Sequence, residues 1–150
     1  MPLRFQVAID CADPARMSRF WSTALGYDVE PPPAGFPTWN EYWLSIGVPP
    51  EELSDTVDAA DSLVDPDGQG PRIWFQQVPE AKSVKNRLHF DIKVGGGRSV
   101  PLPVRRERVD AEVRRLVAAG ASAVLENAPP GVDHYFVLMS DPEGNEFCVV

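Results

Sequence analysis

The chain has 150 residues, of which 43% are hydrophobic and 24% charged, the values of one ordinary globular domain. Its formal net charge of −8 disfavours nucleic acid and anionic membrane surfaces as partners, because both repel an acidic protein. No run approaches the roughly 18 consecutive apolar residues of a membrane span, and we expect no signal peptide. The two cysteines, Cys11 and Cys148, form no CxxC pattern, so we expect reduced thiols and a cytoplasmic protein.

The chain opens with a predicted strand over residues 4–10, followed by a helix. Asp13 can cap that helix and Pro14 suits its first position. Gly26 marks its end, because a left-handed helix end favours glycine. Apolar residues between these limits recur at the spacing of one buried helix face: Met17, Phe20, Trp21, Ala24 and Leu25.

Three further strands are predicted in the first half, over residues 27–30, 41–47 and 72–78. The stretch 49–71 breaks the alternating pattern. We expect a solvated excursion there, with one helical turn, because it contains seven acidic residues and no basic one: Glu51, Glu52, Asp55, Asp58, Asp61, Asp65 and Asp67.

The second half repeats this series of elements. A strand over 87–94 leads through a glycine-rich stretch to a helix that ends at Gly120, and strands follow over 121–126, 134–139 and 145–150. The expected apolar face of this helix is Val109, Val113, Leu116 and Val117. Both halves also place an Asp-Pro turn before their last strand, at Asp65 and at Asp141. The sequence therefore predicts one α+β domain over 1–150 with two βαβββ modules, at about 1–80 and 86–150.

A single sheet of three or four strands with one helix leaves one face uncovered. Pairing of the two modules would close the open faces into a cup. We expect a small-molecule ligand in that cup, since ligand sites are concave.

Four short motifs carry a resemblance to a known family: Phe20-Trp21, Leu25-Gly26, Gly120-Ala121 and Asp141–Asn145. They resemble the glyoxalase/bleomycin-resistance/dioxygenase group, the vicinal oxygen chelate superfamily, and segments 85–91 and 145–148 resemble its bacterial glyoxalase-like branch. The resemblance implies paired βαβββ modules in a cup-shaped, barrel-like mixed sheet with helices outside, and a homodimer. It does not fix the activity, because one scaffold here serves lyases, isomerases, dioxygenases, antibiotic-modifying enzymes and sequestering proteins.

The resemblance also implies four metal-ligand positions, which this chain fills with Gln6, Gln76, His89 and Cys148. This set lacks the carboxylates that Mg²⁺ or Mn²⁺ prefers, so no firmly held metal is predicted. If a divalent metal is present, His89 and Glu146 are the expected ligands, since Glu146 shares a strand face with Cys148.

His89 is the first candidate for proton transfer, with Asp91 on the same strand face, and Glu146 is the second catalytic candidate. The alternative for His89 is a histidine hydrogen-bonded within the interior. Substrate contacts are expected from Gln6, Trp43, Trp74, Gln76, Asp91 and Cys148. Three functions stay open: a lyase- or isomerase-type enzyme without a strongly held metal, a non-catalytic sequestering protein, and a metal-dependent lyase or dioxygenase.

Overall fold

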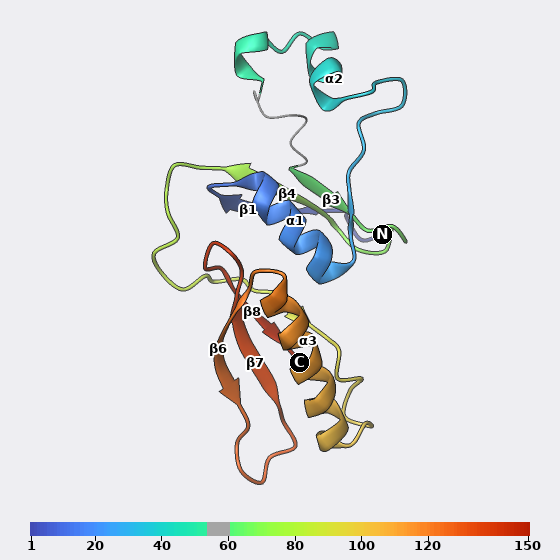
Figure 1. Cartoon of the computed structure of the whole chain (residues 1–150). Helices are drawn as coiled ribbons and strands as arrows, with labels where there is room; N and C mark the ends of the chain where they lie inside the picture. The colour runs from blue at the N-terminus through green and yellow to red at the C-terminus, as the bar shows by residue number, and fades with distance from the viewer. Residues whose placement is uncertain (54–60) are drawn as a thin grey trace. The chain divides into compact units, whose positions relative to one another are not determined.

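The computed structural model describes residues 1–53 and 61–150 (Figure 1). Its chain divides into two compact units. Unit one comprises Met1–Ser22 and Gly26–Val78, and unit two comprises Thr23–Leu25 and Pro79–Val150. Each unit contains its own four-stranded mixed sheet, so the fold class is α+β as predicted. Both sheets are open in the described part of the chain, and their strand pairing closes no barrel.

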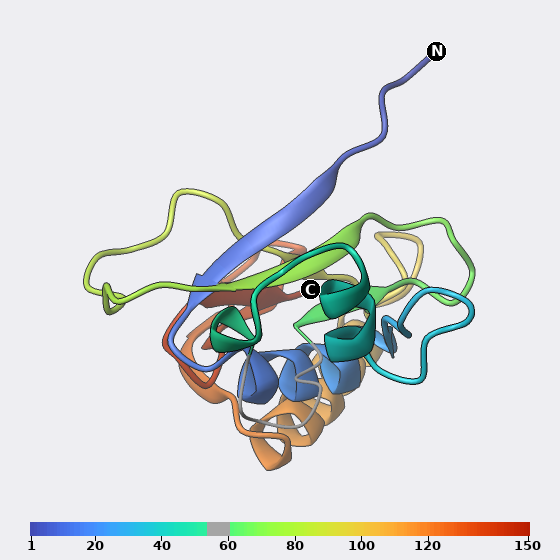
Figure 2. The ribbon, with the colours of Figure 1, turned by 90° about the horizontal axis from the view of Figure 1, so that it is seen from above.

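Unit one is built on the strand order β1-β4-β3-β2. Its strands are β1 (Gln6–Cys11), β2 (Asp28–Val29), β3 (Ser62–Val64) and β4 (Arg72–Gln77). Its helices are α1 (Pro14–Leu25), whose last three residues belong to unit two, α2 (Trp39–Ser45) and the short 3₁₀ helix η1 (Pro50–Glu52). β1 runs parallel to β4, and the other two pairings are antiparallel. Helix α1 lies on one side of this sheet, which the view from above also shows (Figure 2).

The limits of α1 follow from its capping residues. The Asp13 carboxylate accepts a hydrogen bond from the Arg16 backbone N–H at 3.0 Å, and Pro14 occupies the first turn. Gly26 ends the helix with φ 71°, the left-handed conformation that glycine adopts without a steric penalty. The predicted apolar face is confirmed for Met17, Phe20, Trp21 and Ala24, all buried, and Leu25 is half-buried.

The strand predicted over 41–47 is wrong, because this segment lies in helix α2. Thr38 caps it: its Oγ1 accepts a hydrogen bond from the Glu41 backbone N–H at 3.2 Å. The alternation that suggested a strand carries no information here, since α2 buries none of its residues.

The true third strand of this unit is β3, which lies inside the stretch predicted to be a solvated excursion. Three residues are too few to show a period, so the pattern could not reveal this strand. The expected helical turn is present as η1. The rest of the excursion, residues 54–60, lies outside the described residues.

Unit two has the equivalent strand order, β5-β8-β7-β6. Its elements are β5 (Asp91–Ile92), α3 (Leu102–Ala118), β6 (Ser122–Asn127), β7 (Phe136–Ser140) and β8 (Glu146–Val149). The first strand again pairs parallel with the last, and the other pairings are antiparallel. The predicted βαβββ repeat is therefore present in both strand order and strand direction.

Helix α3 packs against β6, β7 and β8. Val109 and Leu116 are its buried residues, and the sheet buries Val137, Met139, Phe147 and Val149. The prediction for Val117 is wrong, since 47% of it is exposed where the helix approaches its end at Ala118. None of the described helices combines the length and the apolar character that crossing a membrane requires.

Candidate functional site

Two similar turns set the register of the two halves. In each turn the first aspartate accepts backbone hydrogen bonds: Asp141 Oδ1 from Glu143 and Asn145 at 2.9 and 3.0 Å, and Asp65 Oδ2 from Gln69 and Gly70 at 2.8 and 2.6 Å. These bonds hold the pKa of the Asp65 carboxyl below its ordinary value, the Gly70 N–H contributing most. The turns are therefore equivalent landmarks.

Strand pairing beside these turns identifies the equivalent positions. Leu138, three residues before Asp141, pairs with Cys148, and Ser62, three residues before Asp65, pairs with Trp74. Arg72 is thus the counterpart of Glu146, and Trp74 is the counterpart of Cys148. Trp74 pairs in parallel with Ala8, whereas Cys148 pairs with Asp91.

This register tests two predicted pairs of equivalent positions, Gln6 with His89 and Gln76 with Cys148. Gln6 and His89 are equivalent, as predicted. The predicted counterpart of Cys148, Gln76, is two residues too far along β4, because the turn that precedes β4 is two residues longer than the one that precedes β8.

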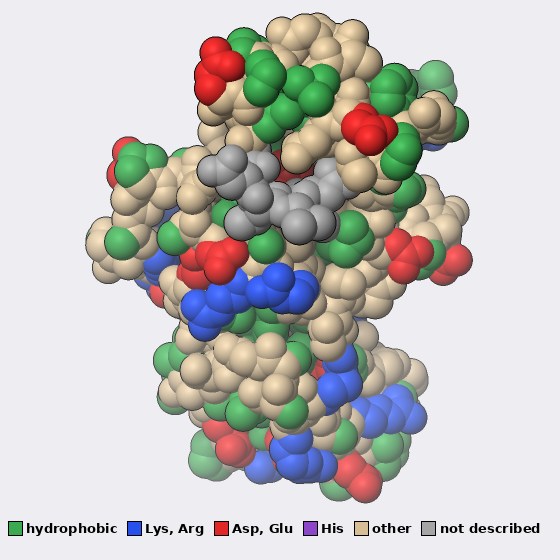
Figure 3. Space-filling view, turned by 45° about the horizontal axis from the view of Figure 1, so that its top comes forward, with side chains coloured by type: hydrophobic (Ala, Val, Ile, Leu, Met, Phe, Trp, Pro, Cys, Tyr) green, Lys and Arg blue, Asp and Glu red, His purple; other side chains and the backbone are tan. Residues whose placement is uncertain are grey.

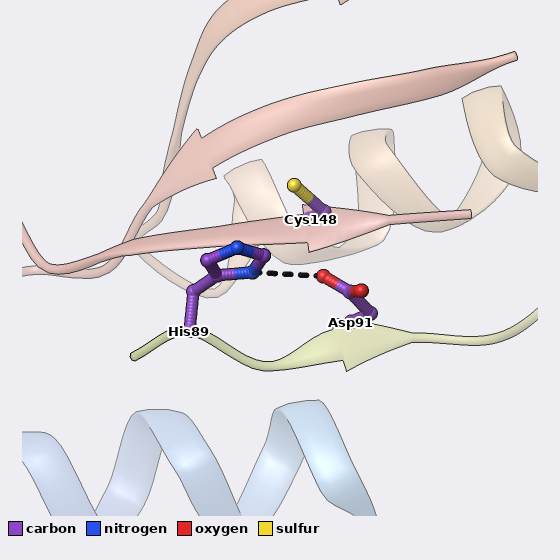
Figure 4. Close-up of side chains that lie close together, drawn as sticks. All are labelled: His89, Asp91 and Cys148. Atoms are coloured by element: carbon purple, nitrogen blue, oxygen red, sulfur yellow. Dashed lines mark hydrogen bonds and ion pairs between the residues drawn. The ribbon is translucent and has the colours of Figure 1, made fainter. Parts of the chain in front are cut away.

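The structure brings together three of the predicted site residues in unit two (Figure 4). His89 Nδ1 lies 2.9 Å from Asp91 Oδ1, and Cys148 is the register partner of Asp91 on β8. One ligand atom from each of the three residues lies within 4.8 Å of the others. His89 itself precedes β5, so the strand predicted over 87–94 is shorter than expected.

The three side chains are accessible to solvent to different degrees. His89 and Asp91 are exposed at 41% and 46% of their side chains, and Cys148 is half-buried. Burial raises the pKa of the Cys148 thiol, and the charge of Asp91 raises it further, against the opposing effect of Lys85. Without a bound cation, this thiol is protonated near neutral pH.

Glu146 does not belong to this group of three side chains. It contacts other residues, which the sequence did not reveal. Its carboxylate accepts a hydrogen bond from the Asn86 backbone N–H at 3.1 Å and pairs with Lys82 Nζ at 3.1 Å. The backbone bond from Asn86, with the Lys82 ammonium beside it, lowers the pKa of Glu146 to about 2. Lys82 and Asn86 lie in a stretch without regular structure, where no periodic signal could indicate a partner 60 residues away.

Asn86 completes this contact as a clamp on β8. Its Oδ1 accepts from the Glu146 backbone N–H at 2.9 Å, while its Nδ2 donates to the carbonyls of Glu146 at 3.0 Å and Leu88 at 2.6 Å. These bonds hold the segment directly before His89 against β8. The Asn86–Glu146 clamp therefore positions the imidazole, although neither residue contacts it.

In unit one, Gln6 belongs to a charged network on the sheet. Arg72 Nη1 donates to Gln6 Oε1 at 2.9 Å, Nε donates to Glu30 Oε2 at 2.8 Å, and Nη2 donates to Ser62 Oγ at 2.8 Å. Gln76 is exposed on the same face of β4, two positions beyond Trp74. The amide of Gln6 is thus already bonded to a cation.

Trp43 and Trp74 both line a pocket of unit one with a volume of about 960 Å³. Trp39 lies beside them, stacked on Trp43 with the ring centroids 5.6 Å apart and the planes at 24°. Hydrophobic side chains gather at the surface over the segment that contains α2, at the top of Figure 3. Among the described residues, four charged ones line the pocket: Asp13, Glu52, Asp61 and Arg72. Gln6 and Gln76 do not line it.

Two of the three indole N–H groups of this pocket donate hydrogen bonds to the protein. Trp39 Nε1 donates to the Glu30 carbonyl at 3.1 Å, and Trp74 Nε1 donates to Asp61 Oδ2 at 3.2 Å. These bonds fix the planes of both rings.

The repeated βαβββ topology and the open mixed sheets define an α+β protein built from two similar modules. A family model described as "Glyoxalase-like domain" matches residues 6–150, so the chain belongs to the glyoxalase-like domain family. The predicted family resemblance is thereby confirmed. No curated protein matches the chain significantly.

Solved structures of three proteins share this fold. A glyoxalase/bleomycin resistance protein/dioxygenase family enzyme from Burkholderia phytofirmans PsJN is 21% identical, with a TM-score of 0.54 over 96% of this chain and 94% of its own. The fosfomycin resistance protein FosX from Listeria monocytogenes, a mutant solved with Mn(II) and 1S,2S-dihydroxypropylphosphonic acid, is 10% identical, with a TM-score of 0.60 over 99% and 91%. TioX from Micromonospora sp. ML1 is 15% identical, with a TM-score of 0.51 over 99% and 97%.

Proposed function

We propose that the protein binds a small organic molecule with a flat aromatic part, and that Trp43 and Trp74 contact it. The observation that carries this proposal is the pocket of unit one, whose volume of about 960 Å³ is large enough for a drug-sized ligand. Three tryptophans in its lining offer flat apolar faces. Such walls favour planar ligands over flexible ones.

The charges in the lining indicate the charge of the ligand that fits this pocket. Arg72 is bonded to the Glu30 carboxylate, so its charge is largely compensated. Glu52 and Asp61 leave the lining with an excess of negative charge. A planar cation therefore suits the pocket best, because indole faces and carboxylates both attract positive charge.

Fluorescence anisotropy of proflavine, a planar cation, tests this proposal. We expect saturable binding that weakens about tenfold or more, equivalent to about 1.4 kcal/mol, in Trp43→Ala and in Trp74→Phe. Leu44→Ala is the matched control, since Leu44 is an exposed residue of α2 outside the pocket lining. The anionic probe 1-anilinonaphthalene-8-sulfonate should bind more weakly. Equal proflavine affinity in all variants, or no saturable binding, would contradict the proposal.

A second candidate function is proton transfer by His89 in a lyase- or isomerase-type reaction. The pairing of His89 Nδ1 with Asp91 favours it, because a carboxylate partner orients the imidazole and leaves Nε2 free to exchange a proton. Glu146 suits a positioning role better than a catalytic one, since a carboxyl with a pKa of about 2 stays ionised near neutrality.

Turnover separates the second candidate from a sequestering protein that only holds its ligand. Thioester, enediolate-forming and catechol substrates are the classes to screen. If His89 transfers the proton, His89→Ala should abolish any turnover found, while Asp91→Asn should reduce kcat more than it changes KM. Ligand binding without turnover would favour sequestration.

The pairing of the two modules into one cup, and a homodimer, are further parts of this proposal that rest on the family resemblance. Light scattering at micromolar concentration should report about twice the chain mass of 16.5 kDa. A monomer at that concentration would remove the dimer from the proposal and leave ligand binding to a single chain.

A further inference from the structure

The four metal positions implied by the family resemblance do not suit a hard divalent ion in this chain. Gln6 is bonded to the Arg72 guanidinium, a cation that would oppose a metal ion beside it. The counterpart of Cys148 in unit one is Trp74, which offers no metal-ligand atom. Mn²⁺ and Mg²⁺ prefer several oxygen ligands, so the implied arrangement with ligands from both modules does not fit these residues.

Unit two alone offers a different ligand set. His89, Asp91 and Cys148 supply an imidazole nitrogen, a carboxylate oxygen and a sulfur, with one atom of each within 4.8 Å of the others. A tetrahedral Zn²⁺ with ligand distances of about 2.0–2.3 Å keeps its ligand atoms roughly 3.5 Å apart. The three ligand atoms, now within 4.8 Å of one another, would close to that separation on binding the ion.

We propose that His89, Asp91 and Cys148 bind a thiophilic divalent cation, Zn²⁺ or Co²⁺, with a water molecule at the fourth position. Sulfur and imidazole ligands select these ions over Mn²⁺ and Mg²⁺. The exposed edges of His89 and Asp91 leave room for the water. The site is independent of the aromatic pocket, so either proposal can fail alone.

The backbone holds the ligands in place before any ion binds. Asp91 and Cys148 are register partners in the parallel pair of β5 and β8. The Asn86–Glu146 clamp fixes the segment directly before His89. Glu146 is not a ligand in this arrangement, because Lys82 and Asn86 already bind its carboxylate. Asp91 therefore replaces Glu146 in the predicted His89–Glu146 ligand pair.

Titration of the metal-free chain with CoCl₂ tests the site through its absorption spectrum. We expect one equivalent to bind, with a near-ultraviolet thiolate-to-Co²⁺ charge-transfer band and the visible bands of a four-coordinate ion. Cys148→Ser should abolish the charge-transfer band. Asp91→Asn and His89→Ala should weaken binding by more than about tenfold, the lower end of the loss seen for outer-shell partners. Excess MnCl₂ should not displace Co²⁺.

Cys11→Ala is the matched control, because Cys11 is the other cysteine of the chain and lies in β1 of unit one. It should keep the band, and circular dichroism should show that each variant is folded. A band that persists in Cys148→Ser, or no saturable Co²⁺ binding, would overturn the proposal. A larger loss of affinity in Glu146→Gln than in Asp91→Asn would overturn it in favour of His89 and Glu146.

Discussion

Glu146→Gln should destabilise unit two by about 1–2 kcal/mol at pH 7. Glutamine keeps the size of the side chain and an oxygen for the Asn86 N–H, but it loses the charge that faces Lys82. A pKa lowered from 4.5 to about 2 corresponds to at most about 3 kcal/mol, at about 1.36 kcal/mol per pH unit. Glu146 and Lys82 are 18% and 22% exposed, so solvent screening reduces that limit.

The pH dependence of this loss follows from the direction of the pKa shift. A lowered pKa stabilises the fold fully above the ordinary value of 4.5, and this contribution is lost as the pH falls toward about 2. Urea denaturation of the wild-type and variant proteins at pH 7 and pH 3 measures it. The difference in free energy of unfolding should be smaller at pH 3.

Glu126→Gln is the matched control for this experiment. Glu126 pairs with Arg106 in unit two, but both side chains are about half exposed, at 56% and 44%. An exposed pair contributes at most about 1 kcal/mol, so this variant should change stability less. A Glu146→Gln loss that is equal at both pH values, or no larger than that of Glu126→Gln, would refute the assignment of the Asn86–Glu146 clamp.

Two further predictions concern the fold, and chemical denaturation measures both. Gly26→Ala should lower the free energy of unfolding by about 1–2 kcal/mol, because φ is 71°; an added Cβ would meet no atom within 4 Å, so the cost is conformational. Unchanged stability would disprove the left-handed helix end at Gly26. Gly120 follows the end of α3 with φ 117°, so Gly120→Val should lose about 1 kcal/mol or more, and unchanged stability would disprove that positive φ. Phe147→Ala should lose about 3–5 kcal/mol, since Phe147 is 1% exposed in the core of unit two, and a loss below about 1 kcal/mol would contradict that burial.

Local signals predicted most of the fold correctly. The cap at Asp13, the glycine at Gly26 and the paired Asp-Pro turns act through nearby backbone groups, so the sequence shows them directly. The strand predicted over 41–47 was wrong because its alternating residues lie on a helix that buries none of them. The capping hydroxyl of Thr38 marks the start of that helix. β3 was missed because three residues cannot show a period.

The candidate site was only partly predictable. Period-two spacing placed His89 beside Asp91, and the structure shows that contact. Their neighbour Cys148 comes from a strand that only the fold brings into register. Glu146 was predicted to share in the site, yet a lysine and an asparagine about 60 residues earlier hold its carboxylate. Contacts over that separation depend on the strand order, which residue patterns do not specify.

A crystal structure of the protein with proflavine would show directly where the ligand binds. We expect density for the acridine ring in the pocket of unit one, flat against Trp43 or Trp74, with its positive charge near Glu52 or Asp61. Density for the ring elsewhere, or a pocket filled by the chain's own side chains, would contradict the claim that this pocket binds a flat organic cation.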